Sequence, residues 1–165
     1  MTVEEMLARE QMRQTMADYT MAGDRLKIDA FVAVFTEDGI LETDGVPQAD
    51  AFRYEGREDI RNWMTRWLRP AGGAPVHQSH FIRHHLSTSQ IEFTGADSAR
   101  SRTYWTAYTD IGPDHCGYYL DTFRKVGEQW LIAHRIIRLD WRSENGLYSN
   151  AVARTSSSAA ADEGG

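Results

Sequence analysis

The sequence is poor in cysteine, in net positive charge and in long hydrophobic runs. Its one cysteine, Cys116, excludes an intramolecular disulfide and any metal site built from several cysteines. The net charge of −6 argues against non-specific binding to nucleic acid, which needs a basic face. No apolar run approaches the roughly 18 residues of a membrane span. Residues 1–13 are acidic and amphipathic, unlike a signal peptide, so we expect a cytoplasmic protein that binds neither nucleic acid nor membrane.

Aromatic residues, by contrast, are abundant, with five Trp and seven Tyr among 165 residues. This length is typical of a single domain with one core. Large rings fill cores, and they also line pockets for flat apolar ligands. We expect one domain over residues 1–150, followed by a disordered tail over 151–165, where Ser, Ala and Gly dominate.

The first part of the chain has the patterns of helices. Thr2–Glu5 has the spacing of a capping box, and apolar residues then recur at helical spacing to about Ala22. A second, short helix is expected over Leu26–Phe35, and the clearest amphipathic helix over Arg57–Leu68. Asp24 lies at the joint between the first two helices. Its side chain can cap the second helix or point into the space that the helices enclose.

After residue 77 the pattern changes to long strands joined by tight turns, one of them at Gly112–Gly117. Three hairpin connections in a row predict a curved antiparallel meander. With a short earlier strand at Ile40–Thr43, the pattern predicts an α+β fold in which helices close one face of the sheet and leave a pocket at the open end. The four long strands are expected at Ser79–Phe93, Ala99–Ile111, Gly117–Val126 and Trp130–Trp141.

The strand Ser79–Phe93 carries histidines where a core strand would carry aliphatic residues. A period of two places His80 and His84 on one face and His85 on the other. An inward histidine needs a polar partner, and Asp24 is the nearest candidate. The alternative is that these histidines are solvated or only hydrogen-bonded. His80 and His84 could together hold zinc, but no neighbouring carboxylate completes such a site, so we expect no metal.

Aromatic side chains are expected to line the pocket, which suits a flat, largely apolar molecule such as a steroid or a fused-ring polyketide. In Ala99–Ile111 the odd positions, which include Trp105, should face the concave side. The substrate-binding candidates are Trp105, Trp63, Phe35 and Arg138. Arg138 and His134 share one face of the last strand with Ile132. They could bind a substrate carboxylate, or they could lie at a contact between subunits of a homodimer or homotrimer.

Four features occur in a characteristic order: Tyr19 and Asp24, Phe35–Gly39, Arg83–Thr88 and Trp130–Arg135. With these features the sequence resembles the SnoaL-like branch of the nuclear transport factor 2-like (NTF2-like) superfamily over residues 4–143. The resemblance implies an NTF2-like cone, a curved antiparallel sheet closed by N-terminal helices around an internal pocket. It is less specific for function, because one fold hosts many activities.

The resemblance also implies catalytic residues. In the members that eliminate water or HCl, an aspartate and a histidine form a dyad inside the cone, and Asp24 and His84 match them. Tyr19 matches a tyrosine that some bile-acid and scytalone-type dehydratases use to polarise a carbonyl or hydroxyl. Where the bile-acid dehydratases have a second acidic residue, this chain has Ala107. The proton that returns to the leaving hydroxyl must therefore come from another group.

On this basis we expect a cofactor-independent lyase of the dehydratase type that acts on a hydrophobic polycyclic substrate. Two alternatives stay open. A double-bond isomerase or polyketide-cyclase-like enzyme would use the same pocket and move a proton between carbons. A non-catalytic small subunit, similar to the β subunit of ring-hydroxylating dioxygenases, would co-purify with a larger iron-containing chain.

Overall fold

The computed structural model describes residues 2–67 and 79–146, which form three helices and a six-stranded sheet. The helices are α1 (Val3–Gly23), α2 (Ile28–Ala33) and α3 (Gly56–Thr65), and a short 3₁₀ helix spans Gln48–Asp50. The expected capping box is present, since the Thr2 hydroxyl accepts from the Glu5 amide and the Glu5 carboxylate accepts from the Thr2 amide. The predicted tail at 151–165 lies outside the described residues.

The sheet is mixed and has the strand order β2-β1-β6-β5-β4-β3. Strands β3 to β6 form the antiparallel meander that the turn spacing predicts. Beyond the meander the sheet also contains a parallel pair, because β1 pairs in parallel with β6 before β2 returns antiparallel to β1. The strands are β1 (Phe35–Asp44), β2 (Arg53–Glu55), β3 (Arg83–Gly95), β4 (Ser98–Thr109), β5 (Gly112–Val126) and β6 (Gln129–Arg142).

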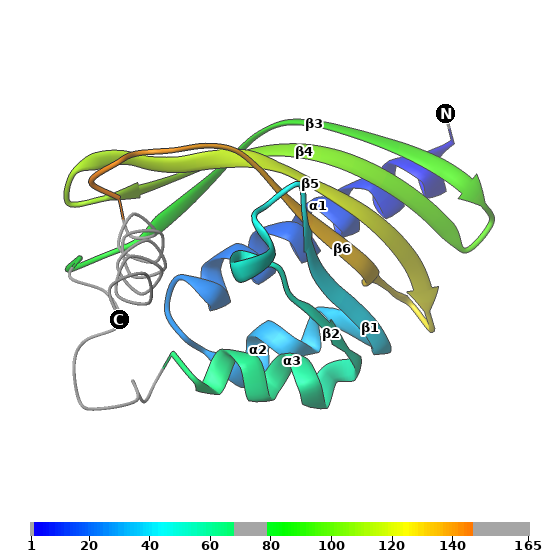
Figure 1. The fold of residues 1–165 in the computed structure, drawn as a ribbon. Helices are drawn as coiled ribbons and strands as arrows, with labels where there is room; N and C mark the ends of the chain where they lie inside the picture. The colour runs from blue at the N-terminus through cyan, green and yellow to red at the C-terminus, as the bar shows by residue number, and fades with distance from the viewer. Residues whose placement is uncertain (1, 68–78, 147–165) are drawn as a thin grey trace, which may run out of the picture.

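The helices lie against one side of the curved sheet, as in an NTF2-like cone (Figure 1). Two hydrogen bonds tie α1 to the strands: Arg9 Nη1 donates to the Ile91 carbonyl at 2.7 Å, and the Thr15 hydroxyl donates to the Trp130 carbonyl at 2.7 Å. The core fills the space between helices and sheet and includes Met12, Met16, Phe31, Phe35, Leu41, Ile60, Phe123 and Ile132.

The inner face of the meander is organised in rows of residues that face one another across the strands. One row, near the starts of β3 and β5, consists of His84, Ala107, His115 and Arg142. The alternation predicted for β4 is confirmed, because its odd-numbered residues are buried and most of its even-numbered ones are exposed. The sheet thus brings two histidines and an arginine from three strands to one side of the molecule.

Two irregularities in the pairing of β5 with β6 change which β6 side chains face inward. One leaves an extra residue between Ile132 and His134, and the other leaves an extra residue between Leu139 and Trp141. Such a bulge reverses the alternation of all residues beyond it. We expected His134 to share a face with Ile132, and this is wrong, because the first bulge separates them.

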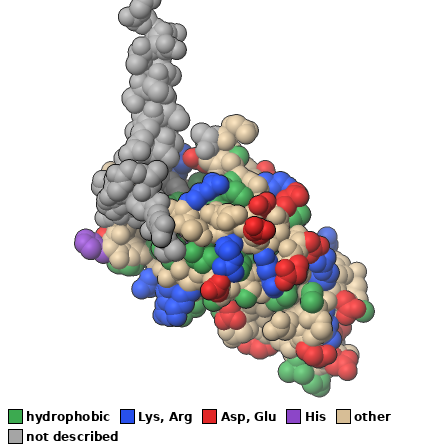
Figure 2. All heavy atoms as spheres, turned by 90° about the horizontal axis from the view of Figure 1, so that it is seen from below, with side chains coloured by type: hydrophobic (Ala, Val, Ile, Leu, Met, Phe, Trp, Pro, Cys, Tyr) green, Lys and Arg blue, Asp and Glu red, His purple; other side chains and the backbone are tan. Residues whose placement is uncertain are grey.

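The face that Figure 2 shows, on the side of α2 and α3, mixes acidic and basic side chains without a field of one sign. Ion pairs between neighbouring elements account for part of this mixture. Arg61 Nη1 lies 2.5 Å from Asp29 Oδ1, and Arg57 pairs with Glu37. Among the described residues, no helix is long and apolar enough to cross a membrane.

Candidate active site

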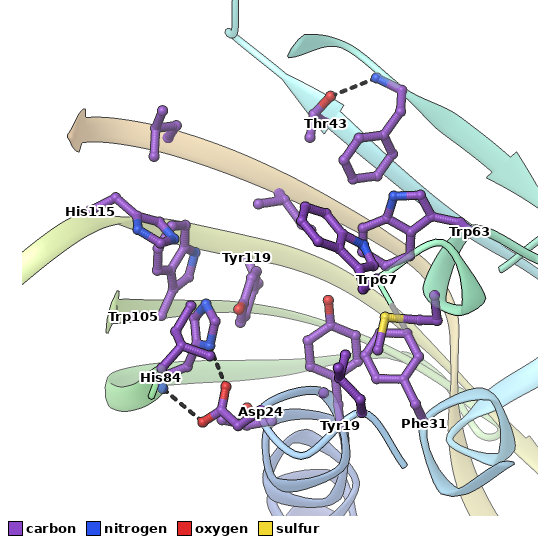
Figure 3. A pocket seen from close by; sticks show the side chains of 18 of the residues that line it. Tyr19, Asp24, Phe31, Thr43, Trp63, Trp67, His84, Trp105, His115 and Tyr119 are labelled. Atoms are coloured by element: carbon purple, nitrogen blue, oxygen red, sulfur yellow. Dashed lines mark hydrogen bonds and ion pairs between the residues drawn. The ribbon is translucent and has the colours of Figure 1, made fainter. Parts of the chain in front are cut away.

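A cavity of about 370 Å³ opens between the inner face of the sheet and the helices. Its lining is mostly aromatic and aliphatic; Asp24, His84 and His115 lie together toward one end, and Trp63 and Trp67 lie toward the other (Figure 3). This distribution suits a ligand with an apolar body and a polar group at one end. Of the predicted site residues, Tyr19, Asp24, Trp63, His84 and Trp105 line this cavity.

His84 and Asp24 meet at the polar end of the cavity. The Asp24 carboxylate accepts two hydrogen bonds from His84, one from ring Nδ1 at 2.6 Å and one from the backbone amide at 2.9 Å. The Asp24 side chain is 7% exposed and that of His84 is 24% exposed. Because an ionised carboxylate only accepts hydrogen bonds, Nδ1 carries the proton and Nε2 has the free lone pair.

The end of α1 positions this carboxylate. Asp24 is the C-cap residue of the helix, and its backbone amide donates to the carbonyls of Thr20 and Ala22. Its side chain does not cap α2, whose N-cap is Lys27 without a side-chain hydrogen bond. Of the two orientations that the sequence allowed, the structure has the one in which Asp24 points to the cavity and His84 (Figure 3).

Tyr19 contributes a hydroxyl to the cavity, and its ring belongs to a buried cluster. Arg135 is wholly buried and lies against the rings of both Tyr19 and Tyr119, with its guanidinium carbon 4.0 and 4.1 Å from the two ring centroids. Asp121 accepts from Arg135 Nε and Nη2, both at 2.7 Å. Burial raises the pKa of both tyrosine hydroxyls, although Arg135 opposes this, so both stay protonated as donors at neutral pH.

The apolar end of the cavity is a cluster of stacked and edge-on rings. Trp63 is central to it, with ring centroids 5.1 Å from Phe52, 6.2 Å from Phe31 and 6.3 Å from Trp67. Nearer the polar end, Trp105 stacks on Tyr119 at 5.5 Å and lies 5.8 Å from the His84 ring. Flat aromatic walls of this kind favour a flat ring system as ligand.

Two predicted substrate-binding residues lie outside the cavity lining. Phe35 is fully buried in the core, where it packs against Tyr19 and Phe31 at 5.9 Å each. Arg138 lies on the opposite face of β6, with Nη2 3.2 Å from Asp44 Oδ2. The bulge after Ile132 is the physical reason for the second error, because it turns Arg138 away from the cavity.

Sequence reasoning missed His115, which lines the cavity and is 3% exposed. The glycines and proline of Gly112–Gly117 predicted a turn, whereas β5 begins at Gly112 and carries His115 and Cys116. Had the strand been extended to Gly112, its alternation would have placed His115 on the same face as Tyr119. Arg142 was also missed; it lines the cavity and pairs with Asp50 at 3.1 Å.

His115 has its own carboxylate partner. Its Nδ1 lies 2.7 Å from Asp114 Oδ1, and both side chains are almost fully buried. Burial lowers the pKa of the His115 imidazole, and Asp114 opposes this shift.

Within residues 2–67 and 79–146, no three His, Cys, Asp or Glu side chains gather as a metal site would require.

Comparison of the sequence with known protein families finds one match. The family is described as "SnoaL-like domain", and it matches residues 4–136. No curated protein matches the chain.

Solved structures with the same fold come from several kinds of protein. One, named as a candidate scytalone dehydratase from Novosphingobium aromaticivorans, is 24% identical over 87% of this chain and 91% of its own, with a TM-score of 0.69. A hexachlorocyclohexane dehydrochlorinase from Novosphingobium barchaimii is 13% identical over 86% and 92%, at 0.67. The β subunit of a candidate aromatic-ring-hydroxylating dioxygenase from N. aromaticivorans is 17% identical over 84% and 93%, at 0.68. At these identities the likeness shows the fold alone.

Proposed function

The chain belongs to the SnoaL-like domain family, and we propose that it is a cofactor-independent lyase of the dehydratase type. Its substrate is a flat, largely apolar molecule with a hydroxyl group beside an acidic carbon, such as a hydroxy-ketosteroid. The observation that supports this most is the imidazole of His84, which Asp24 orients at the polar end of a cavity with aromatic walls.

The first step is removal of a carbon-bound proton by His84. Asp24 holds the proton on Nδ1, so Nε2 acts as the base, and the carboxylate stabilises the imidazolium that forms. Negative charge then develops on the substrate carbonyl oxygen. The protonated hydroxyl of Tyr19 is the donor that stabilises this charge, since donors aimed at developing charge lower the barrier.

The aromatic end of the cavity holds the rest of the substrate. Burial of a fused ring system against Trp63, Phe52 and Trp105 supplies binding energy at about 25 cal/mol per Å² of apolar surface. That energy fixes the acidic carbon beside His84, and positioning of this kind contributes directly to rate. The proposed substrate class therefore follows from the division of the cavity into an aromatic end and an end with histidines.

The two alternatives use the structure differently. An isomerase or polyketide-cyclase-like enzyme would use the same base but return the proton to carbon. The other alternative is a non-catalytic small subunit, and a dioxygenase β subunit shares this fold. Such a subunit would not need a histidine that a carboxylate orients inside a cavity. The His84–Asp24 pair thus favours an enzyme over a non-catalytic subunit.

The test is exchange of carbon-bound hydrogen for solvent deuterium. The protein is incubated in D₂O with a panel of β-hydroxy ketosteroids and related fused-ring ketones, and mass spectrometry follows both deuterium uptake and loss of water. We expect exchange and dehydration of at least one compound by the wild type. His84→Ala should lose both, whereas His134→Ala, which replaces a histidine on the outer face paired with Glu42, should retain both. Exchange without loss of water would favour the isomerase.

We also propose a homodimer or homotrimer assembled through the outer face of the sheet. Several large apolar side chains are exposed there, including Tyr104, Tyr108 and Trp141. Exposed apolar patches on sheets favour association. Light scattering at micromolar concentration tests this, and a monomer would contradict it.

A further inference from the structure

We propose that the His115–Asp114 pair is the second acid–base group of this site, and that His115 protonates the leaving hydroxyl while His84 removes the carbon-bound proton. The inference rests on the proposed function. It assigns a donor for the proton that the leaving hydroxyl needs, a role that Ala107, the register neighbour of both histidines, cannot fill.

The register of the sheet brings the two histidines to one cavity wall. His84 faces Ala107 across β3 and β4, and Ala107 faces His115 across β4 and β5. The methyl group of Ala107 is too small to separate the rings, whose centroids are 5.8 Å apart at an interplanar angle of 80°. Both imidazoles line the same cavity (Figure 3). A substrate carbon can therefore lie against one ring while its neighbour's hydroxyl lies against the other.

Asp114 fixes His115 much as Asp24 fixes His84. Its carboxylate lies 2.7 Å from His115 Nδ1 and accepts from the Thr109 hydroxyl at 3.0 Å, and its backbone carbonyl accepts from the Ser143 amide at 2.7 Å. The Asp114 side chain is 2% exposed, so the carboxylate is held in place. Because Nδ1 of His115 is hydrogen-bonded to this carboxylate, we assign the proton transfer to Nε2.

Neighbouring charges decide how readily His115 carries a proton. The His84 ring lies so close to the His115 ring that a positive charge on one disfavours a positive charge on the other. Arg142 is the register partner of His115 on β6, and its charge is paired with Asp50. Burial lowers the pKa of His115, which makes its protonated form a stronger acid. The reaction needs His84 neutral and His115 protonated, and the lowered pKa of His115 makes this the less populated form of the pair.

The step balances with these two groups. His84 Nε2 takes the proton from the carbon next to the carbonyl, and the electron pair of that C–H bond forms the new C=C bond. The C–O bond of the neighbouring carbon breaks with its electron pair on oxygen, and the proton on His115 Nε2 joins this oxygen to give water. His84 is left as imidazolium and His115 as neutral imidazole. One proton passing through solvent from His84 to His115 restores the starting state.

A pair of substrates that differ only in the leaving group tests the assignment. 3-Hydroxy-1-tetralone must lose hydroxide, which needs a proton, whereas 3-chloro-1-tetralone loses chloride without one. Both yield fluorescent 1-naphthol, so the rates of wild type, His115→Gln and His85→Gln are read by fluorescence after subtraction of the spontaneous reaction. His85→Gln is the matched control, because His85 is exposed on the outer face against the Tyr108 ring.

We expect His115→Gln to slow the hydroxy compound by about 10²-fold or more, the usual contribution of a general acid, and to leave the chloro compound unchanged. His85→Gln should change neither rate. Activity on the chloro compound also shows that the variant is folded. Should His115→Gln not fold, Asp114→Asn, which keeps the shape of the carboxyl, should slow the hydroxy compound selectively.

Other results overturn the assignment. Equal losses on both compounds would mean that His115 only supports the structure. Unchanged rates on both would mean that His84 returns the proton itself. Failure of the wild type to accelerate either reaction would contradict the proposed function, and the inference would fall with it.

Discussion

Replacement of Asp24 by asparagine isolates the electrostatic part of the site, because it removes one charge and keeps the side-chain shape. The carboxylate now accepts two hydrogen bonds, from the backbone amide and from Nδ1 of His84. The backbone amide can only donate, so it binds the single oxygen of the new side chain, whose NH₂ group then faces Nδ1. Nδ1 must then accept, which moves the ring proton to Nε2 and blocks the base.

The size of the effect follows from this change of tautomer. General base catalysis contributes about 10²–10⁴-fold, and most of it should be lost in Asp24→Asn. The free energy of unfolding should fall by no more than about 1.5–3 kcal/mol, the value of one hydrogen bond to a charged group. The amide oxygen keeps the other contact, with the backbone amide of His84. Ligand affinity should stay nearly the same, since the aromatic end of the cavity is untouched.

The assay combines deuterium exchange on a confirmed substrate with nitrogen NMR of labelled histidine. We expect the exchange rate to fall and the His84 ring proton to move from Nδ1 to Nε2. The midpoint temperature of thermal unfolding should fall only slightly. An exchange rate equal to that of the wild type, with the tautomer changed, would refute the reasoning, because the base would then be another group.

Three further predictions concern groups around this dyad. Tyr19→Phe should cost less than loss of His84 or Asp24, about 10²-fold in turnover, because it deletes one donor and leaves the base. Gly117→Ala should lower the free energy of unfolding by at least about 1–3 kcal/mol in a denaturant titration, because a Cβ there would clash with the Arg138 carbonyl oxygen; wild-type stability would contradict this. Asp121→Ala should cost about 3–5 kcal/mol, since it leaves Arg135 buried without its carboxylate partner. A loss below about 1 kcal/mol in the same titration, the size expected for exposed pairs, would show that water or another group replaces Asp121.

Sequence periodicity predicted most of the helices and the meander because each depends on local spacing. The alternation of β4 placed Trp105 and Ala107 correctly on the inner face, since that strand is regular over this stretch. The contact between Asp24 and His84 was also expected, and the hydrogen bonds confirm it. Their catalytic use stays a prediction.

The errors arose where the structure departs from regular alternation. Neither bulge in β6 has a local signature in the sequence, yet the first turns His134 and Arg138 outward. Gly112 and Pro113 are typical turn residues, and they concealed the start of β5 and with it His115. The parallel pairing of β1 with β6 joins segments distant in sequence, which no local pattern reports.

The central claim is that His84 removes a proton from a substrate carbon, and a crystal structure with a bound β-hydroxy ketosteroid tests it most directly. We predict the acidic carbon at about 3–3.5 Å from His84 Nε2, the contact distance of a reactive pose. The carbonyl oxygen should lie within hydrogen-bond distance of the Tyr19 hydroxyl, with the rings against Trp63. A ligand bound in the cavity with its acidic carbon away from His84 would contradict the account.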